Sequence, residues 1–241
     1  MRLIVTRPAE DAAQLCRRLE AAGHEPILSP LLEIRPLAEL AIPPRHYQAV
    51  LITSANGARA LAGRSEIERL KRARVLAVGP ASAEAAREAG LGQVEEAAGD
   101  VAALARLAVG TLRPQEGPLL YVSGAVTAGD LASTLSASGF EVDRVVTYEA
   151  RPAEALPKLC AAALAAGRAD GVLLYSPRTA HIWVALVQAG GLAPAASRLV
   201  HYCLSGNVAA VVRDGIADDV PLQVASRPDE FALLELIPPP A

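Results

Sequence analysis

Six short loops rich in serine, threonine, asparagine and glycine are the parts of this 241-residue chain whose composition could support chemistry. They are residues 6–8, 53–57, 79–82, 123–127, 176–179 and 205–207. We expect each loop to open a helix, and a helix N-terminus offers free N–H groups and a positive partial charge that suit carboxylates or phosphates. The same residue types cap ordinary helices. Together the six loops favour a shared anion-binding cleft, with simple capping as the open alternative.

Two arginines in equivalent kinds of loop are the candidates for fork-like contacts to carboxylates. These are Arg7 and Arg178, and the alternative for each is a solvated side chain or a surface ion pair. The other residues expected to bind a ligand at these loops are Thr6, Thr53, Ser54, Asn56, Ser82, Gly124, Ser176 and Ser205.

Several other kinds of site are absent from the sequence. It contains no GxGxxG or GxxxxGK[ST] nucleotide signature, no HExxH metal motif and no GxSxG nucleophile elbow. The four histidines have no ligand spacing, and the three cysteines are far apart, which indicates reduced, buried thiols. We therefore expect no metal site and no hydrolase triad.

Charge and hydropathy limit the partners and the compartment. The formal net charge of −3 does not favour nucleic acid or an acidic membrane surface. No apolar run approaches the roughly 20 residues that span a bilayer, and the chain begins directly with a strand-like segment rather than a signal peptide. The expectation is a soluble, cytoplasmic protein.

Short apolar runs alternate with helical patterns along the chain and must position these loops. The first run, Leu3–Val5, precedes a helical pattern that stops at Gly23. Similar runs recur at 49–52, 75–78, 119–122, 171–174 and 199–203. This alternation predicts an α/β fold with parallel sheets covered by helices on both faces, and the loops then lie at the carboxyl ends of strands, where such folds bind ligands.

The chain also resembles itself. A shift of 116 residues maps Leu3 onto Leu119 and Gly23 onto Gly139, and a shift of 122 maps residues 50–54 onto 172–176. Two extended segments, 33–37 and 145–150, fall outside the repeat and could pair as a connector. The repeat fits two consecutive domains or one domain inserted into the other. Tyr148 lies in the second extended segment, where its side chain could face a cleft.

Nearly the whole chain resembles the uroporphyrinogen-III synthase family. The segments that carry the resemblance are 5–8, 51–57, 77–83, 146–148, 176–177 and 225–228. Each is short, but their order and spacing together are specific. The resemblance implies two flavodoxin-like parallel-sheet lobes, the second inserted into the first. One lobe is then 1–32 with 153–241, the other is 42–143, and residues 33–41 and 144–152 form the two-stranded connector. It also implies a monomer without metal or organic cofactor.

The same resemblance implies a reaction. The substrate, the linear tetrapyrrole hydroxymethylbilane, carries eight carboxylates and loses its terminal hydroxyl as water, and closure through a spiro intermediate inverts the last pyrrole to give uroporphyrinogen III. Tyr148 matches the family's tyrosine and would assist departure of the hydroxyl. The family holds its ligand largely by backbone N–H groups, so we expect the loss of a single side chain such as that of Ser54 to be mild.

The chain departs from the family pattern at two places. Ser205 or Asn207 stands where a threonine is typical, and Ser123-Gly124 replaces an arginine-glycine pair.

Two other functions stay open on the residues alone. One is a non-catalytic two-lobed binder of an anionic small molecule, and the other is a nucleotide-sugar transferase, although no loop suggests a diphosphate site.

Overall fold

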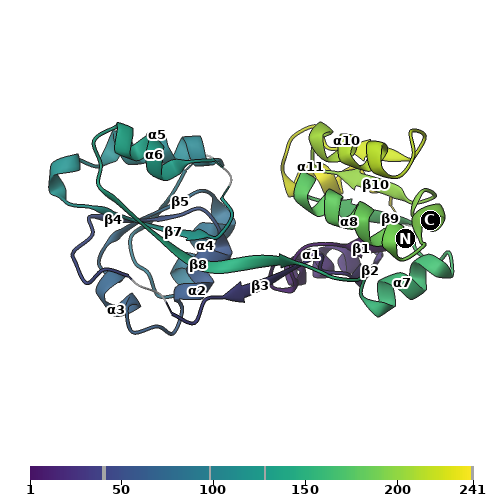
Figure 1. The fold of residues 1–241 in the computed structure, drawn as a ribbon, viewed down its shortest axis with the longest axis horizontal. Helices are drawn as coiled ribbons and strands as arrows, with labels where there is room; N and C mark the ends of the chain where they lie inside the picture. The colour runs from purple at the N-terminus through teal and green to yellow at the C-terminus, as the bar shows by residue number, and fades with distance from the viewer. Residues whose placement is uncertain (40–41, 98, 128, 240–241) are drawn as a thin grey trace. The chain divides into compact units, whose positions relative to one another are not determined.

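A computed structural model describes residues 1–39, 42–97, 99–127 and 129–239 (Figure 1). Internal contacts divide the chain into unit 1, Met1–Glu33 with Arg151–Ala241, and unit 2, Ile34–Ala150. The chain passes from one unit to the other within two strands, β3 (Leu32–Pro36) and β8 (Val142–Pro152), which are neighbours in one sheet. The last two residues of the expected connector segment 33–41 lie outside the described residues.

Unit 1 contains a five-stranded parallel sheet, sheet A, in the order β11-β10-β9-β1-β2. Its strands are β1 (Arg2–Val5), β2 (Glu25–Leu28), β9 (Gly171–Leu174), β10 (Val200–Cys203) and β11 (Leu222–Val224). The helices of the unit are α1 (Ala9–Ala21), α7 (Lys158–Ala165), α8 (Pro177–Ala189), α9 (Ala193–Ala196), α10 (Gly206–Gly215) and α11 (Glu230–Leu234).

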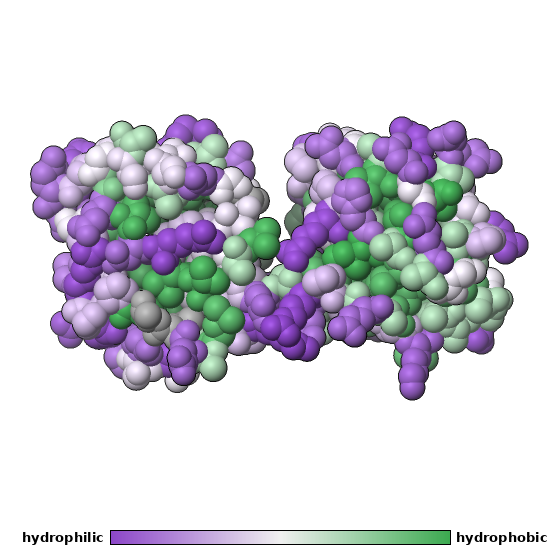
Figure 2. Space-filling model, viewed as in Figure 1, coloured by the Kyte–Doolittle hydropathy of each residue, from purple (hydrophilic) through white to green (hydrophobic). Residues whose placement is uncertain are grey.

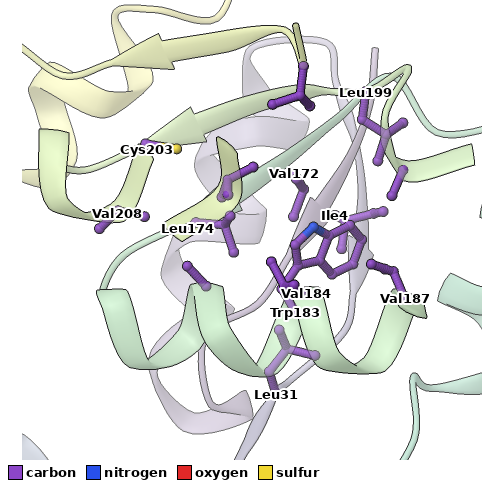
Figure 3. Packing of buried hydrophobic residues seen from close by; sticks show 14 of the residues in the cluster. Ile4, Leu31, Val172, Leu174, Trp183, Val184, Val187, Leu199, Cys203 and Val208 are labelled. Carbon is purple, nitrogen blue, oxygen red and sulfur yellow. The ribbon is translucent and has the colours of Figure 1, made fainter. Parts of the chain in front are cut away.

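Alternating side chains of sheet A enter two separate cores, as the two-residue period of a strand requires. Ile4 and Val172 pack with α7, α8 and α10 around the fully buried Trp183 (Figure 3). Leu3 and Leu173 pack on the other face with α1 and α11. Both faces are therefore covered, which explains why the strands read as continuous apolar runs.

Unit 2 contains sheet B, in the order β3-β8-β7-β4-β5-β6. Its other strands are β4 (Ala49–Ile52), β5 (Arg74–Ala77), β6 (Val94–Glu96) and β7 (Leu119–Gly124). Its helices are α2 (Ala55–Leu61), α3 (Ile67–Leu70), α4 (Pro80–Glu88), α5 (Val101–Thr111) and α6 (Leu131–Ala137), with a short 3₁₀ helix, η1 (Pro114–Glu116). Val50 and Leu120 pack with α2, α3 and α4, whereas Leu51 and Leu119 pack with α5 and α6 on the opposite face (Figure 1).

The strands of the two units follow the same order in space, but the chain enters that order at a different strand, as in a circular permutation. The order β8-β7-β4-β5-β6 matches β2-β1-β9-β10-β11, and the internal repeat maps β1 onto β7 and β4 onto β9. In unit 1 the chain forms β1 first, whereas in unit 2 it forms β4, β5 and β6 before β7. Each sheet therefore has a switch point, where the strand order reverses its direction across the sheet and the two central strands lead to helices on opposite faces. These are β1/β9 in sheet A and β4/β7 in sheet B.

The predicted α/β architecture with parallel sheets is confirmed, and each of the six predicted apolar runs forms a strand within one or two residues of its expected bounds. One expectation is wrong: the loop 123–127 does not itself open a helix. β7 continues through Gly124, and α6 begins at Leu131 with Asp130 as its N-cap. On the face shown in Figure 2, hydrophilic side chains are spread over both units rather than gathered on one.

Candidate functional site

The switch point of sheet A brings two of the predicted loops together. Val5 pairs with Leu173, so Thr6 and Arg7 after β1 lie beside Tyr175 and Ser176 after β9. Thr6 is fully buried, and its Oγ1 donates a 2.6 Å hydrogen bond to the Leu173 carbonyl. Its side chain therefore ties the two strand ends together and is directed into the protein rather than toward a ligand.

Arg7 is held from two sides. Its Nη1 lies 2.6 Å from Glu230 Oε2, and its guanidinium carbon lies 4.9 Å from the centre of the Tyr175 ring. Glu230 also contacts Arg18, with 2.8 Å between Oε1 and Nη1. Burial and the Glu230 charge raise the pKa of the Tyr175 phenol, so this ring is neutral. The switch point thus carries two guanidinium groups that share one carboxylate.

The other predicted residues of unit 1 lie at helix starts. Ser176 is the N-cap of α8, and its Oγ accepts a 3.1 Å hydrogen bond from the Thr179 N–H. Arg178 is half-buried in the first turn of the same helix. Ser205 is the N-cap of α10, but its side chain makes no capping bond within the described part of the chain. Ser205 is half-buried, whereas Asn207, the other residue expected in place of a threonine, is exposed.

At the switch point of sheet B, the loop after β4 uses most of its side chains internally. Ser54 is the N-cap of α2, and its Oγ accepts a 3.2 Å bond from the Asn56 N–H. Asn56 is 8% exposed, and its Oδ1 accepts a 2.8 Å bond from Arg59. Thr53 Oγ1 lies 3.4 Å from the Tyr121 hydroxyl. These contacts give the loop a fixed shape.

Ser82 lies in the first turn of α4 and is 5% exposed, so it is buried in the unit rather than presented on the surface. The loop residue before this helix, Gly79, is the N-cap and is followed by Pro80. None of the described heavy atoms would lie within 4 Å of a Cβ placed on Gly79. The space at this helix start is therefore beside the glycine, not at the serine side chain.

Tyr148 lies directly against the end of β7. β8 pairs with β7 in parallel, but the register shifts: Val146 pairs with Ser123, and Tyr148 pairs with Gly124. The extra residue is Thr147, which is fully buried and whose Oγ1 donates to the Ser123 carbonyl at 3.3 Å. A Cβ on Gly124 would lie 2.7 Å from Tyr148 Cζ and 2.9 Å from its Oη. The phenol therefore occupies the position that a side chain at residue 124 would need.

A further guanidinium contacts the same loop. Arg144 donates from Nε to Ser123 Oγ at 2.9 Å, and from Nη2 to the carbonyls of Gly124 at 3.0 Å and Ala125 at 3.3 Å. Ser123 stands where the resemblance led us to expect an arginine, and Arg144, on the neighbouring strand β8, places a positive charge on this loop.

A depression of about 1060 Å³ runs along α5 and α6 and reaches Thr53 and Val78. Its polar groups include Asp100 and Asp130, the N-cap residues of those helices. Its charged lining is these two carboxylates and one guanidinium, that of Arg106, so the charge of this depression does not favour a polyanionic ligand. Among the described residues, no group of three or more His, Cys, Asp or Glu side chains could hold a metal ion.

The predicted site residues thus form two groups, one at the carboxyl edge of each sheet. Sequence reasoning missed Tyr175, Glu230 and Arg144, which hold Arg7 and the loop at Gly124 in place. Arg144 directly precedes the extended segment 145–150 that contains Tyr148, and this position in the sequence could have identified it as a candidate. Glu230 is 223 positions from Arg7, and nothing in the local sequence links them.

A family model identifies the family of this chain, and solved structures support its fold. The family model described as uroporphyrinogen-III synthase HemD matches residues 13–235. A crystal structure of uroporphyrinogen-III synthetase from Helicobacter pylori 26695 superposes with a TM-score of 0.65 at 14% identity, covering 98% of each chain. A mutant uroporphyrinogen III synthase from the extremely thermophilic bacterium Thermus thermophilus gives 0.50 at 18% identity, covering 98% of this chain and 96% of that one. At these identities the two structures support the fold alone. A search of the curated proteins found no match.

Proposed function

Because this chain belongs to the uroporphyrinogen-III synthase family, whose members are cyclising lyases, we propose that it converts hydroxymethylbilane into uroporphyrinogen III with loss of water. The family match spans residues 13–235, which includes β4 and β7 at the switch point of sheet B and β9 at that of sheet A, whereas β1 and Arg7 lie before it. The observation that carries the residue-level proposal is the Tyr148 phenol, which is packed on Gly124 at the carboxyl end of β7.

The substrate's carboxylates suit the groups found at the two sheet edges. Arg7 and Arg178 supply positive charge in unit 1, and Arg144 supplies it in unit 2. The starts of α4, α8 and α10 add backbone N–H groups. Thr6, Asn56 and Ser82 are buried, so we assign them to shaping the loops, whereas Thr53, Ser54, Ser176 and Ser205 are half-buried and have access to a ligand.

In the first step the C–O bond of the terminal hydroxymethyl group breaks. The pyrrole nitrogen lone pair supplies the electrons, which leaves a cationic azafulvene, and the departing hydroxyl takes up a proton and leaves as water. Tyr148 donates a hydrogen bond to that hydroxyl, directly or through a water, and lowers the energy of the transition state. The two ends then join through the spiro intermediate, and release of a proton completes the ring.

The remaining work is conformational. Without an enzyme the same cation closes to the symmetric type I isomer, so the protein must hold the chain where inverted closure has the shorter path. Fixed loops suit this task. The loop at Ser54 is shaped by its own hydrogen bonds, and Arg7 is held by Glu230 and Tyr175.

We further propose that the enzyme acts as a cytoplasmic monomer without metal or organic cofactor. The reaction written above is balanced without an oxidant or reductant, and none of the described helices is long and apolar enough to cross a membrane. Light scattering of the purified protein tests the monomer. Full activity after exhaustive dialysis against a chelator tests the cofactor-free reaction, and lost activity restored by one metal would contradict it.

The test of function is isomer analysis after the purified protein is mixed with freshly generated hydroxymethylbilane. We expect mainly type III product, and a fall in rate of at least about tenfold in Tyr148→Phe, since a positioned proton donor contributes roughly 10²–10⁴-fold. Type III product at an unchanged rate in that variant would remove Tyr148 from the mechanism. Type I product alone, as in a protein-free control, would overturn the synthase function and favour the non-catalytic binder.

A further inference from the structure

The position of the Tyr148 phenol depends on a bulge in β8, which has no counterpart in the pairing of β1 with β2. Between the pairs Ser123–Val146 and Gly124–Tyr148, β8 has one residue more than β7. Such a bulge disrupts the ladder locally and redirects the side chain that follows it, and it is common beside active sites. The bulged residue, Thr147, is held by its Oγ1 bond to Ser123 and by a 2.9 Å bond from the Leu37 N–H to its carbonyl.

The ring then needs space on β7, and only glycine provides it. A Cβ on residue 124 would lie 2.7 Å from Tyr148 Cζ, 2.9 Å from Oη and 3.0 Å from Cε2. The contact is with the hydroxyl end of the ring. A side chain at 124 would therefore displace the hydroxyl itself, while the Tyr148 backbone stays bonded through its carbonyl to the Ala125 N–H at 2.9 Å.

The loop under the ring is fixed from the other side by Arg144. Its guanidinium binds Ser123 Oγ and the carbonyls of Gly124 and Ala125, the residues that flank and support the phenol. Arg144 is itself on β8, four positions before Tyr148. β8 therefore carries both the Tyr148 phenol and the guanidinium that fixes the loop against which the phenol packs.

We propose that Gly124 and Arg144 are positioning residues for Tyr148, and that together with the bulge at Thr147 they set where its hydroxyl lies during loss of the substrate hydroxyl. This inference rests on the proposed role of Tyr148. Gly124 then acts through the space it leaves for the ring, rather than as the substrate-binding residue that the sequence suggested.

The kinetic test is a double-mutant cycle on the rate of type III product formation. We expect Gly124→Ala to lower kcat about tenfold with KM changed less than about twofold, because it displaces a group that acts in the chemical step. In the Tyr148→Phe background the same substitution should change kcat less than about twofold, since the hydroxyl it displaces is already gone. A tenfold loss in both backgrounds would overturn the proposal.

Arg144→Met provides a second route that adds no bulk to the core. We expect it to lower kcat a few-fold in the wild type and to have little effect in the Tyr148→Phe background. The charge-matched control is Arg106→Met, which removes an exposed guanidinium from α5 in the same unit. Equal losses of kcat in the two arginine variants would mean that charge alone, not the loop contact, is responsible, and would overturn the role of Arg144.

A readout independent of activity is ¹⁹F NMR of protein labelled with 3-fluorotyrosine. The chain has five tyrosines, and Tyr148→Phe identifies the resonance of residue 148. Gly124→Ala and Arg144→Met should move that resonance, whereas Gly110→Ala, whose added Cβ would have no described heavy atom within 4 Å, should move none. An unmoved Tyr148 resonance in Gly124→Ala would overturn the inference. Failure of the proposed function would instead appear in the wild type, as type I product alone.

Discussion

The indole of Trp183 donates a 3.2 Å hydrogen bond from Nε1 to Nε2 of His201, inside the main core of unit 1. Both residues are fully buried, and His201 Nδ1 lies 3.1 Å from the Leu199 carbonyl. The imidazole therefore donates through Nδ1, accepts through Nε2 and is neutral. Because Trp183 is the chain's single tryptophan, its fluorescence reports on this pair.

This pair predicts a loss of stability in mild acid. Burial lowers the pKa of His201 to about 4, so the unfolded chain binds a proton near its ordinary value of about 6.5 while the folded chain does not. The free energy of unfolding should fall by up to about 3 kcal/mol as the pH drops from 6.5 to 4. The contribution of His201 to that free energy should be constant above pH 6.5 and below pH 4. Urea titrations followed by Trp183 fluorescence measure it. The decline should flatten in His201→Gln but not in the exposed control His181→Gln, and equal slopes in all three proteins would contradict the assignment.

Helices α8 and α10 approach so closely that a methyl group cannot be added between them. A Cβ on Gly215 would lie 2.5 Å from Val184 Cγ1. Gly215→Ala should destabilise unit 1 by about 1–3 kcal/mol, since overpacking outweighs the helix propensity that alanine gains. Gly206→Ala in the same helix, where a Cβ meets open space, should be neutral or stabilising. Urea unfolding of both variants measures this, and adding Val184→Ala should recover part of the loss. Equal stability of the two variants would contradict the close contact.

Glu230 lowers the net positive charge at the switch point of sheet A, because it is shared by Arg7 and Arg18. Its replacement by glutamine should lower the KM for the polycarboxylate substrate a few-fold at low salt, and the gain should shrink as salt screens the charges. Arg7→Met should raise KM. The exposed Glu235→Gln, with the same change in net charge, is the control for Glu230→Gln. A KM that rises in Glu230→Gln would mean that holding Arg7 in place matters more than the added charge.

The three cysteines should differ in reactivity. Cys160 and Cys203 are fully buried, and burial raises the pKa of Cys203 to about 12, whereas Cys16 is only partly buried. Burial and the charge of Glu20 also raise the pKa of Cys16, so its reaction should be slow. Titration with a thiol reagent at pH 8 should modify one residue in the native protein and three after denaturation. Cys16→Ser should remove the native reaction, and fast modification of two or more native thiols would contradict the burial of Cys160 and Cys203.

The sequence by itself determined the local elements, the repeat and the family. Apolar runs such as Leu3–Val5 and Ala49–Ile52 are continuous because both faces of each sheet are covered, so they could be recognised one at a time. The loops at Arg7, Ser54, Ser176 and Ser205 were predictable for the same local reason, since each directly follows such a run. Tyr148 was identified by its extended segment and by the resemblance to the family.

Only the tertiary structure decided what depends on pairing across long distances. The repeat alone fits consecutive or inserted units equally well. The resemblance to the family implies insertion, and the pairing of β1 with β9, where Val5 meets Leu173, is seen only in the tertiary structure. The bulge at Thr147 depends on how β8 meets β7, because it is a difference in residue count between two strands. The partner of Arg7 comes from the far end of the chain. A local pattern specifies which residues are apolar or polar, whereas the neighbours of each strand and charge are set by the packing of the whole chain.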